Sequence, residues 1–302
     1  MILLINYKVA GGEIMPFTLS PLRYPGGKTQ LYKFVNHIIG INDMHDVIYC
    51  EPFCGGAGIA TTLLLNKNVS SIILNDFDIS IYSVWYAILN ETNKFINKIL
   101  ETPITIDEWQ IQKDIYESFN NKATSYCFEL AFATLFLNRT NRAGIITGGP
   151  IGGFSQQSKY DISCRFNKKK IINKITNIAN HKNQIQLFNL NASELINNHL
   201  LSINPTSLFI YFDPPYYKQG KNLYKNFFNQ QDHIDLSKKI RSMDNFKWIT
   251  TYDNSDEIKN IYNDRMIYEY KLQYSANKTR KETELLFCSN STKIEPFANV
   301  SF

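Results

Sequence analysis

Apolar residues follow two different patterns along this chain of 302 residues. Short apolar runs such as Leu208–Phe212 have the length of buried strands, whereas stretches such as Ile79–Leu89 repeat apolar residues at helical spacing. Strands and helices that alternate in this manner predict an open, doubly wound α/β sheet. The other expected strands begin at Val47 and Ser71 and then cover Gln184–Phe188, Phe246–Thr251, Met266–Tyr274 and Glu284–Cys288. Further helices are expected at Leu31–Ile39 and Ile59–Asn66.

Helical patterns dominate between the second and third expected strands, at Glu108–Phe119 and Thr124–Leu137. A chain of this length can bury a sizeable core and usually divides once. We therefore expect a catalytic domain of residues 1–90 and 182–302 and a largely helical insert of residues 91–181.

The run Asp213-Pro214-Pro215-Tyr216 follows directly on the strand pattern of Leu208–Phe212. Ligands of open α/β sheets bind at the carboxyl ends of strands, where a carboxylate and a free carbonyl can accept the two hydrogens of a planar amine. Proline has no N–H and a fixed φ, so the carbonyl before it can point at a substrate, and Tyr216 offers a flat face to a nucleobase. The tetrad predicts methylation of an amino group, whereas a simple strand-to-loop stop is the alternative interpretation.

A glycine-rich turn lies well upstream, in Glu51-Pro52-Phe53-Cys54-Gly55-Gly56-Ala57-Gly58. Glycine permits positive φ and close approach of the backbone to a ligand, as nucleotide-like cofactors require. Asp76 ends the next expected strand, where its carboxylate can bind ribose hydroxyls or cap the helix that follows. The turn has neither Gly-x-Gly-x-x-Gly spacing nor a Lys-Ser or Lys-Thr pair, and acidic strand ends suit S-adenosylmethionine, which carries a sulfonium and no phosphate.

A third element, Pro21-Leu22-Arg23-Tyr24-Pro25-Gly26-Gly27-Lys28, lies near the amino end. With the other two, it resembles the adenine-specific (N6) DNA methyltransferases related to the GATC-methylating DNA adenine methylases. In that family a Pro-Gly-Gly-Lys-type segment opens the chain, Glu-Pro-Phe-x-Gly-x-Gly forms the first cofactor loop, and Asp-Pro-Pro-Tyr ends the fourth strand. The resemblance extends through Phe136–Arg139, Arg165–Asn167 and Glu282–Phe287, and so covers nearly the whole chain.

The resemblance implies a Rossmann-like S-adenosylmethionine-dependent methyltransferase fold with its target-recognition region in the insert, and Asp213, Pro214, Pro215 and Tyr216 as the catalytic residues. Two positions depart from the family pattern. Asn191 stands where an acid is common, from which we expect altered cofactor affinity, and Ala57 stands where many relatives have glycine, with a methyl group too small to block the site. The residues implied to contact the cofactor are Tyr24, Pro25, Gly26, Gly27, Lys28, Glu51, Pro52, Phe53, Gly55, Gly56, Asp76, Phe77, Asn191 and Asp213.

Groups suited to DNA recognition gather in the insert, in Asn138–Gly144 and in the glycine loop Gly148–Gly153. Arginine and asparagine can make bidentate contacts to guanine and adenine edges, although a polar loop with an arginine that caps the preceding helix is the alternative. Basic residues also cluster at Arg165–Lys170 and Lys278–Lys281, while the net charge of +5 is mild. The expected DNA contacts are Asn138, Arg139, Arg142, Arg165 and Lys168.

These elements predict transfer of a methyl group from S-adenosylmethionine to the exocyclic amine of an adenine that is flipped out of duplex DNA. Methylation at carbon 5 of cytosine is disfavoured because the chain has no Pro-Cys pair. Enzymes that act on the 4-amino group of cytosine usually resemble Ser-Pro-Pro-Tyr. An RNA base methyltransferase is the second candidate, and a catalytically silent DNA-binding protein of the same fold is the third.

Weaker signals concern location and partners. No long apolar span predicts a transmembrane helix, residues 1–15 do not form a convincing signal peptide, and Met15 is a second candidate for the native start. Five cysteines without a Cys-x-x-Cys pair fit a reduced cytoplasm, and the five histidines form no ligand cluster with cysteine, so no metal is expected. We expect double-stranded DNA as the partner and a monomer or weak dimer. The setting is a restriction-modification system with a cognate endonuclease, a phage, or solitary regulation.

Overall fold

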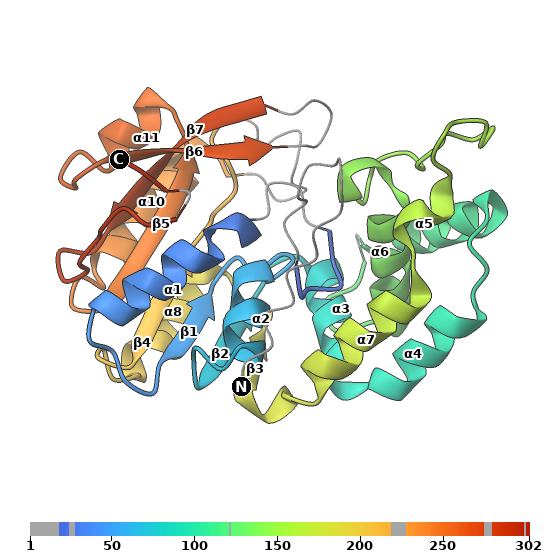
Figure 1. The fold of residues 1–302 in the computed structure, drawn as a ribbon, viewed down its shortest axis with the longest axis horizontal. Coiled ribbons are helices and arrows are strands. Elements are labelled where there is room, and N and C mark those ends of the chain that lie inside the picture. Colours follow the sequence, from blue (N-terminus) through green and yellow to red (C-terminus); the bar gives the residue numbers. More distant parts are fainter. Residues whose placement is uncertain (1–17, 24–27, 121, 219–227, 275–279, 299) are drawn as a thin grey trace.

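The computed structural model describes residues 18–23, 28–120, 122–218, 228–274, 280–298 and 300–302. Its strands are β1 (Ile48–Glu51), β2 (Ser71–Asn75), β3 (Ile185–Phe188), β4 (Leu208–Phe212), β5 (Lys247–Asp253), β6 (Tyr268–Tyr274) and β7 (Arg280–Cys288). They form one seven-stranded sheet of order β3-β2-β1-β4-β5-β7-β6 (Figure 1). Strands β1 to β5 pair in parallel, whereas β7 pairs antiparallel with both β5 and β6.

This strand order, with an antiparallel β7 between β5 and β6, confirms the expected Rossmann-like methyltransferase fold. Each strand expected from the sequence is present. The starts of five strands differ from the expectation. β1, β3 and β5 begin one residue late, β6 begins two residues late and β7 begins four residues early. For β3 the reason is that Gln184 ends a short 3₁₀ helix, Lys182–Gln184. Helical and strand periodicity in the sequence therefore predicted the sheet well.

Helices cover both faces of the sheet. They are α1 (Tyr32–Ile41), α2 (Gly58–Leu65), α3 (Ile79–Asn90), α8 (Ala192–Asn198), α10 (Gln230–Arg241) and α11 (Asp256–Ile261). Successive strand residues point to opposite faces, so Tyr49 and Phe209 join a hydrophobic cluster with α1, α2 and α3. Cys50 and Ile210 join a second cluster with α8, α10 and α11. Burial on both faces explains why these parallel strands are almost continuously apolar.

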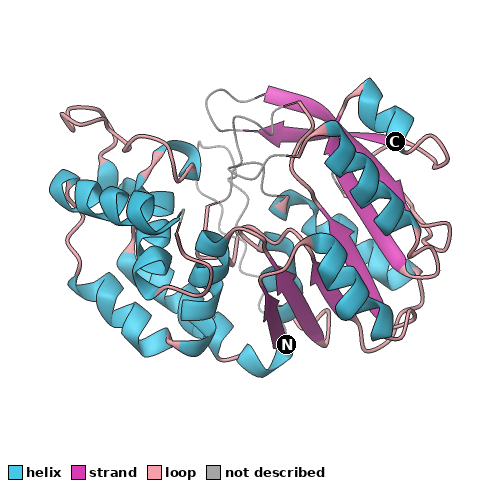
Figure 2. Ribbon diagram, turned by 180° about the vertical axis from the view of Figure 1, so that it is seen from behind, coloured by secondary structure: helices cyan, strands magenta, loops and turns pink. Residues whose placement is uncertain are grey.

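The insert is helical and lies beyond the β3 edge of the sheet (Figures 1 and 2). Its helices are α4 (Thr92–Glu101), α5 (Ile106–Asn120), α6 (Phe128–Thr140) and α7 (Lys168–Ala179). Two of them, α4 and α7, were not expected from the sequence, and α6 begins four residues later than expected. Trp109, Phe132 and Ile175 belong to the cluster that also packs under α3. The sheet and the insert thus share one core, and their division into two domains stays a prediction.

The described part of the chain has no helix that combines the length and the apolar character needed to cross a bilayer.

Candidate active site

The site lies at the carboxyl ends of β1 and β4, where the order of strands in the sheet reverses. This switch point is where open α/β sheets bind ligands. Asp213 is the first residue after β4, and its carboxylate receives two hydrogen bonds on Oδ1, from Lys28 Nζ at 3.0 Å and from Thr251 Oγ1 at 2.9 Å. Its side chain is 24% exposed. Among the described residues, none donates a hydrogen bond to Oδ2.

Lys28 is the buried cation of the site. Besides Asp213, its ammonium group donates to Tyr216 Oη at 2.8 Å and lies 3.5 Å from Glu284 Oε2. Burial alone lowers the pKa of a lysine, but the carboxylates of Asp213 and Glu284 outweigh that effect and hold the pKa of Lys28 well above its usual value. Lys28 is therefore charged, and it connects the amino-terminal segment to the tetrad.

Glu284 lies behind the tetrad on β7 and is 2% exposed. Its carboxylate accepts hydrogen bonds from Tyr216 Oη at 3.2 Å and from Tyr270 Oη at 2.8 Å. Burial raises the pKa of Glu284, and the charge of Lys28 counteracts that rise. Sequence reasoning did not identify this residue. The available signal was an acid at an inward-facing position of a strand whose next residues, Leu285–Phe287, are all buried.

Tyr216 is more enclosed than a stacking surface alone would require. Its side chain is 6% exposed, its hydroxyl joins Lys28 and Glu284, and Lys28 Nζ lies 4.7 Å from the ring centroid. Lys28 and Glu284 therefore fix the position of the hydroxyl. The role of the Tyr216 ring as a stacking platform stays a prediction. Pro214 is buried and Pro215 half-buried beside it.

Glu51 lies beneath the glycine-rich turn. It is buried, and its Oε1 accepts hydrogen bonds from the backbone N–H of Ala60 at 3.0 Å and from Tyr49 Oη at 3.1 Å. Ala60 is in the first turn of α2, so the carboxyl group satisfies one of the free amides at that helix terminus. Burial raises the pKa of Glu51 to about 8. In this structure Glu51 supports the turn from below.

The turn itself has two residues in the left-handed region, Gly55 at φ 44° and Ala57 at φ 43°. Glycine adopts this conformation without cost, whereas alanine pays a steric penalty there. Ala57 therefore carries a steric penalty that a glycine at this position would avoid. Trp85 Nε1 donates to the Gly55 carbonyl at 2.9 Å, and Gly56 and Pro52 are buried beside it.

Asp76 follows β2 and faces the turn. Its Oδ2 accepts from the Gly55 N–H at 2.8 Å and its Oδ1 from the Asp78 N–H at 3.0 Å. The sequence left open whether Asp76 caps α3, and that alternative is wrong, because the cap is Asp78, whose carboxylate accepts from the Ser80 N–H. Burial, and then the charge of Asp78, raise the pKa of Asp76 to about 7. The neighbouring Phe77 ring is 58% exposed.

Asn75 joins two loops of the site and was missed by sequence reasoning. Its buried Nδ2 donates to the carbonyls of Pro52 at 2.8 Å and Leu190 at 2.9 Å, and its Oδ1 accepts from the Leu190 N–H. Asn191, predicted to contact the cofactor, caps α8 in a capping box with Glu194. Phe53 is half-buried, and its ring centroid lies 6.1 Å from that of Phe228.

Of the predicted amino-terminal cofactor residues, Tyr24, Pro25, Gly26 and Gly27 lie outside the described residues, whereas Lys28 is in the centre of the site.

Asn138 is completely buried at the end of α6. Its Oδ1 accepts from the Arg23 N–H at 2.8 Å, and its Nδ2 donates to the carbonyls of Arg23 at 2.6 Å and Gly144 at 3.0 Å. A Cβ at Gly144, which has φ +79°, would collide with the Arg23 carbonyl oxygen. The side chain predicted to read DNA thus holds the backbone at Arg23, a few residues before Lys28.

Arg139 is half-buried in the last turn of α6. It donates to the carbonyls of Arg165 and, at 3.5 Å, Pro21, so it does not act as the helix cap that was the alternative. Burial and the charges of Arg23 and Arg165 lower its pKa to about 10. Lys174 lies in the same cationic cluster, where burial and the charge of Arg139 lower its pKa to about 8.

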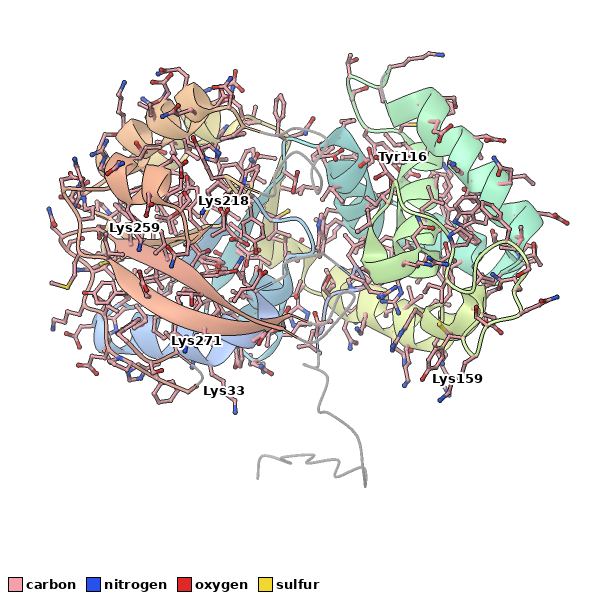
Figure 3. The ribbon with its side chains drawn as sticks, turned by 90° about the horizontal axis from the view of Figure 1, so that it is seen from above. Lys33, Tyr116, Lys159, Lys218, Lys259 and Lys271 are labelled. Carbon is pink, nitrogen blue, oxygen red and sulfur yellow. The ribbon has the colours of Figure 1, made fainter. Side chains whose placement is uncertain are left out.

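The remaining predicted DNA contacts differ in exposure. Arg142 is exposed beside the glycine loop, and its backbone N–H donates to the Gly149 carbonyl at 3.0 Å. The Arg165 side chain is exposed as well. Lys168 Nζ donates to the Leu100 carbonyl at 2.7 Å, at the end of α4. Lys159, on the same insert, marks the side of the molecule away from the sheet (Figure 3).

Comparisons with known proteins place this geometry in context. The chain is 24% identical over 248 residues to the type II methyltransferase M.MjaIII of Methanocaldococcus jannaschii. The aligned region covers 77% of this chain and 81% of that protein. The chain is 25% identical over 255 residues to the type II methyltransferase M.CviBI of Paramecium bursaria Chlorella virus NC1A, covering 84% and 90%.

Among solved structures, an rRNA methyltransferase of Streptomyces viridochromogenes, AviRa, matches with a TM-score of 0.37 and 13% identity, covering 89% of this chain and 87% of that one. A family model described as D12 class N6 adenine-specific DNA methyltransferase matches residues 24–276. Because that match spans most of the chain, it confirms the resemblance predicted from the sequence, and the chain belongs to the D12 class N6 adenine-specific DNA methyltransferases.

Proposed function

We propose that this protein methylates the exocyclic amine of an adenine at a specific site in duplex DNA, after the base has been flipped into the site at the ends of β1 and β4. One observation carries the proposal. Asp213 Oδ1 is held by Lys28 and Thr251, while the side chain stays 24% exposed and no described residue donates to its Oδ2. A carboxylate fixed on one oxygen and accessible on the other suits an acceptor for an amine hydrogen.

The cofactor of the family is S-adenosylmethionine, and the residues present fit it. Asp76 offers carboxylate oxygens for ribose hydroxyls, and the exposed Phe77 ring can cover an adenine. The carboxylates of the partly exposed Asp213 and the buried Glu284 exceed the single charge of Lys28, which favours a cation nearby. When bound, the cofactor supplies a methyl group on a positively charged sulfur.

The chain contributes alignment and electrostatics to the reaction. Asp213 Oδ2 and the carbonyl of Pro214 accept the two hydrogens of the adenine amine, which leaves the nitrogen lone pair directed at the methyl group. Tyr216 forms the wall against which the flipped base stacks. Lys28 holds Asp213 and Tyr216 in place. The amine loses its proton after transfer, when it is cationic and far more acidic, so Asp213 does not have to be a strong base.

For DNA contact we propose Arg142 and Arg165 as the leading side chains, because both are exposed on the insert. Arg139 and Lys174 add positive charge close to Arg165 and favour a backbone phosphate there. Asn138 acts indirectly, since its amide is bonded to Arg23 and Gly144. Cytoplasmic location, a cognate endonuclease and a monomeric or weakly dimeric state stay predictions.

The test is incubation of the purified protein with labelled S-adenosylmethionine and separate pools of duplex DNA and structured RNA. The products are digested and the modified nucleoside is identified. N6-methyladenine in DNA is the expected result. Label in RNA would transfer the substrate to the second candidate, and cofactor-independent DNA binding without label would favour the silent binding protein.

A further inference from the structure

The carboxyl end of β5 contacts the tetrad at both of its ends, through two side chains that sequence reasoning did not identify. Thr251 bonds the first residue of the tetrad, and Asp253 bonds the backbone that follows the last. The register of β4 with β5 explains the proximity, because Phe212 pairs with Thr250 and so brings the next two residues of each strand side by side.

Thr251 is completely buried, and its hydroxyl group lies between the hydroxyl of Tyr211 and the carboxylate of Asp213. Its Oγ1 donates to Asp213 Oδ1 at 2.9 Å, and it lies 2.9 Å from Tyr211 Oη. A hydroxyl has one hydrogen to donate, so Tyr211 is the donor to Thr251. Burial and the charge of Asp213 raise the pKa of Tyr211, in agreement with a protonated phenol. The chain therefore runs from Tyr211 through Thr251 to the carboxylate.

Asp253 receives the first two backbone amides after Tyr216. Its Oδ1 accepts from the Tyr217 N–H at 2.8 Å and its Oδ2 from the Lys218 N–H at 2.9 Å. Lys218, labelled in Figure 3 on the sheet side of the molecule, also donates from Nζ to the Asn254 carbonyl at 3.1 Å. Three hydrogen bonds thus tie this short segment to the end of β5.

The tetrad needs such anchors because of its own composition. Pro214 and Pro215 have no N–H, so the segment between Asp213 and Tyr216 has no amide of its own with which to bind a neighbouring strand. The side-chain anchors that the described residues provide lie at its two ends. We infer that Thr251 and Asp253 are positioning residues for methyl transfer, which act through the Asp213 carboxylate and through the backbone after Tyr216. The inference rests on the proposed function.

Thr251→Val tests the first anchor. Valine keeps the branched shape and strand preference of threonine and removes only the hydroxyl. We expect the single-turnover rate of methyl transfer to fall by about 10- to 100-fold, because small misplacements of reacting groups cost that much. The dissociation constants for S-adenosylmethionine and DNA should stay within about threefold. Thr251→Ser should restore the rate.

Thr250→Val is the matched control. Thr250 is equally buried, is the adjacent residue of β5 and points to the opposite face. The Thr250→Val variant should keep the single-turnover rate within about twofold of wild type. A wild-type rate for Thr251→Val, or an equal loss of rate for both valine variants, would overturn the role of Thr251.

Asp253→Asn tests the second anchor by amide hydrogen exchange and by the transfer rate. We expect faster exchange at Tyr217 and Lys218 together with a slower rate. The control is Asp244→Asn, before β5, where a half-buried acid likewise accepts a backbone N–H, that of Asn290 at 2.8 Å. It should speed exchange at Asn290 and leave the rate unchanged.

The two readouts separate the inference from the proposed function. Wild-type exchange at Tyr217 and Lys218 in Asp253→Asn would overturn the anchoring role whether or not the protein methylates DNA. Faster exchange with a wild-type rate would leave a structural anchor without influence on the reaction, which also contradicts the inference. A wild-type protein that transfers no methyl group to DNA would contradict the proposed function, and the exchange result would still decide on the anchor.

Discussion

Acidic side chains in different surroundings have different tasks in this site. Glu51 is buried under the glycine-rich turn and Glu284 behind the tetrad, whereas Asp76 and Asp213 are partly exposed and face the proposed ligands. Burial favours the neutral form of a carboxyl group, and the raised pKa values of Glu51, Asp76 and Glu284 follow that rule. A ribose hydroxyl binds an ionised carboxylate more strongly than a neutral acid, so cofactor binding and pH are coupled at Asp76.

Cofactor affinity should therefore rise with pH through the pKa of Asp76, which burial raises to about 7. If binding needs the carboxylate, the dissociation constant for S-adenosylmethionine should fall by about tenfold from pH 6 to pH 8. Asp76→Asn should bind more weakly and with a flatter pH dependence. Calorimetric titration of both proteins at several pH values measures these dissociation constants. Any ionisation of the cofactor itself affects both proteins equally, so the variant also serves as the control for it. Equal slopes for the two proteins would refute the coupling.

Residues at strand ends could be predicted, because their position follows from local patterns. Asp213 and Asp76 each follow an apolar run, and the sequence alone placed both at the carboxyl edge of the sheet. Thr251 and Glu284 could not be found this way. They reach the tetrad only through the pairing of β5 with β4 and β7, over 38 and 71 residues of chain from Asp213. Nothing in their own segments specifies that pairing.

At the scale of elements, the loop between β1 and α2 is held by contacts from three sides. Glu51 bonds the first turn of α2 from below, Trp85 bonds Gly55 from α3, and Asn75 bonds Pro52 from β2. Ala57 accepts a left-handed conformation within this frame. The loop was predicted from its glycines, but its supports come from separate helices and strands.

Glycine substitutions in this loop and in the first turn of α2 separate backbone strain from packing. In Ala57→Gly, relief of about 1 kcal/mol of left-handed strain offsets the loss of a buried methyl group, about 0.8 kcal/mol, so stability should hardly change. In Ala60→Gly, the lost methyl group and the lower helix propensity add to a destabilisation of about 1.5 to 2 kcal/mol. Urea unfolding measures both. A loss for Ala57→Gly as large as that for Ala60→Gly would show that no strain is stored at residue 57.

At the scale of the whole molecule, the insert holds the segment that leads into the catalytic centre. Asn138, Arg139 and Lys174 bond the backbone of residues 20–23, and Lys28 follows within five residues of Arg23. We interpreted Asn138 and Arg139 as DNA-reading groups because of their type and their place in the insert. Residue type does not reveal whether a side chain faces solvent or a distant chain segment, and here the partner lies 115 residues away.

Asn138→Asp should weaken this connection. The variant replaces an N–H donor with an oxygen that faces the carbonyls of Arg23 and Gly144, so we expect a loss of roughly 1 to 3 kcal/mol in the free energy of unfolding. The same substitution at the exposed Asn177 of α7 is the control and should cost less than about 0.5 kcal/mol. Denaturant unfolding gives both values. Equal, small losses would mean that the buried amide contributes nothing.

Overall stability should depend on pH through Glu51. Its pKa is about 8 in the folded protein and 4.5 as the ordinary value, so its favourable contribution is complete below pH 4.5 and is lost as pH rises through 8. Glu51→Gln cannot ionise. Between pH 6 and 9, the variant should gain roughly 2 kcal/mol relative to wild type in the cofactor-free state. Thermal unfolding across this pH range measures the effect, and the exposed Glu101→Gln is the control. The same pH dependence of stability in wild type and both variants would contradict the account.

The central claim, that Asp213 accepts a hydrogen of the adenine amine, is tested most directly by single-turnover methyl transfer to duplex DNA with wild type and Asp213→Ala. Lys28 keeps Glu284 as a partner in the variant, so the fold should persist. We expect N6-methyladenine with wild type and loss of transfer by at least about 1000-fold in the variant, while cofactor and DNA still bind. Transfer by Asp213→Ala at the wild-type rate would contradict the account.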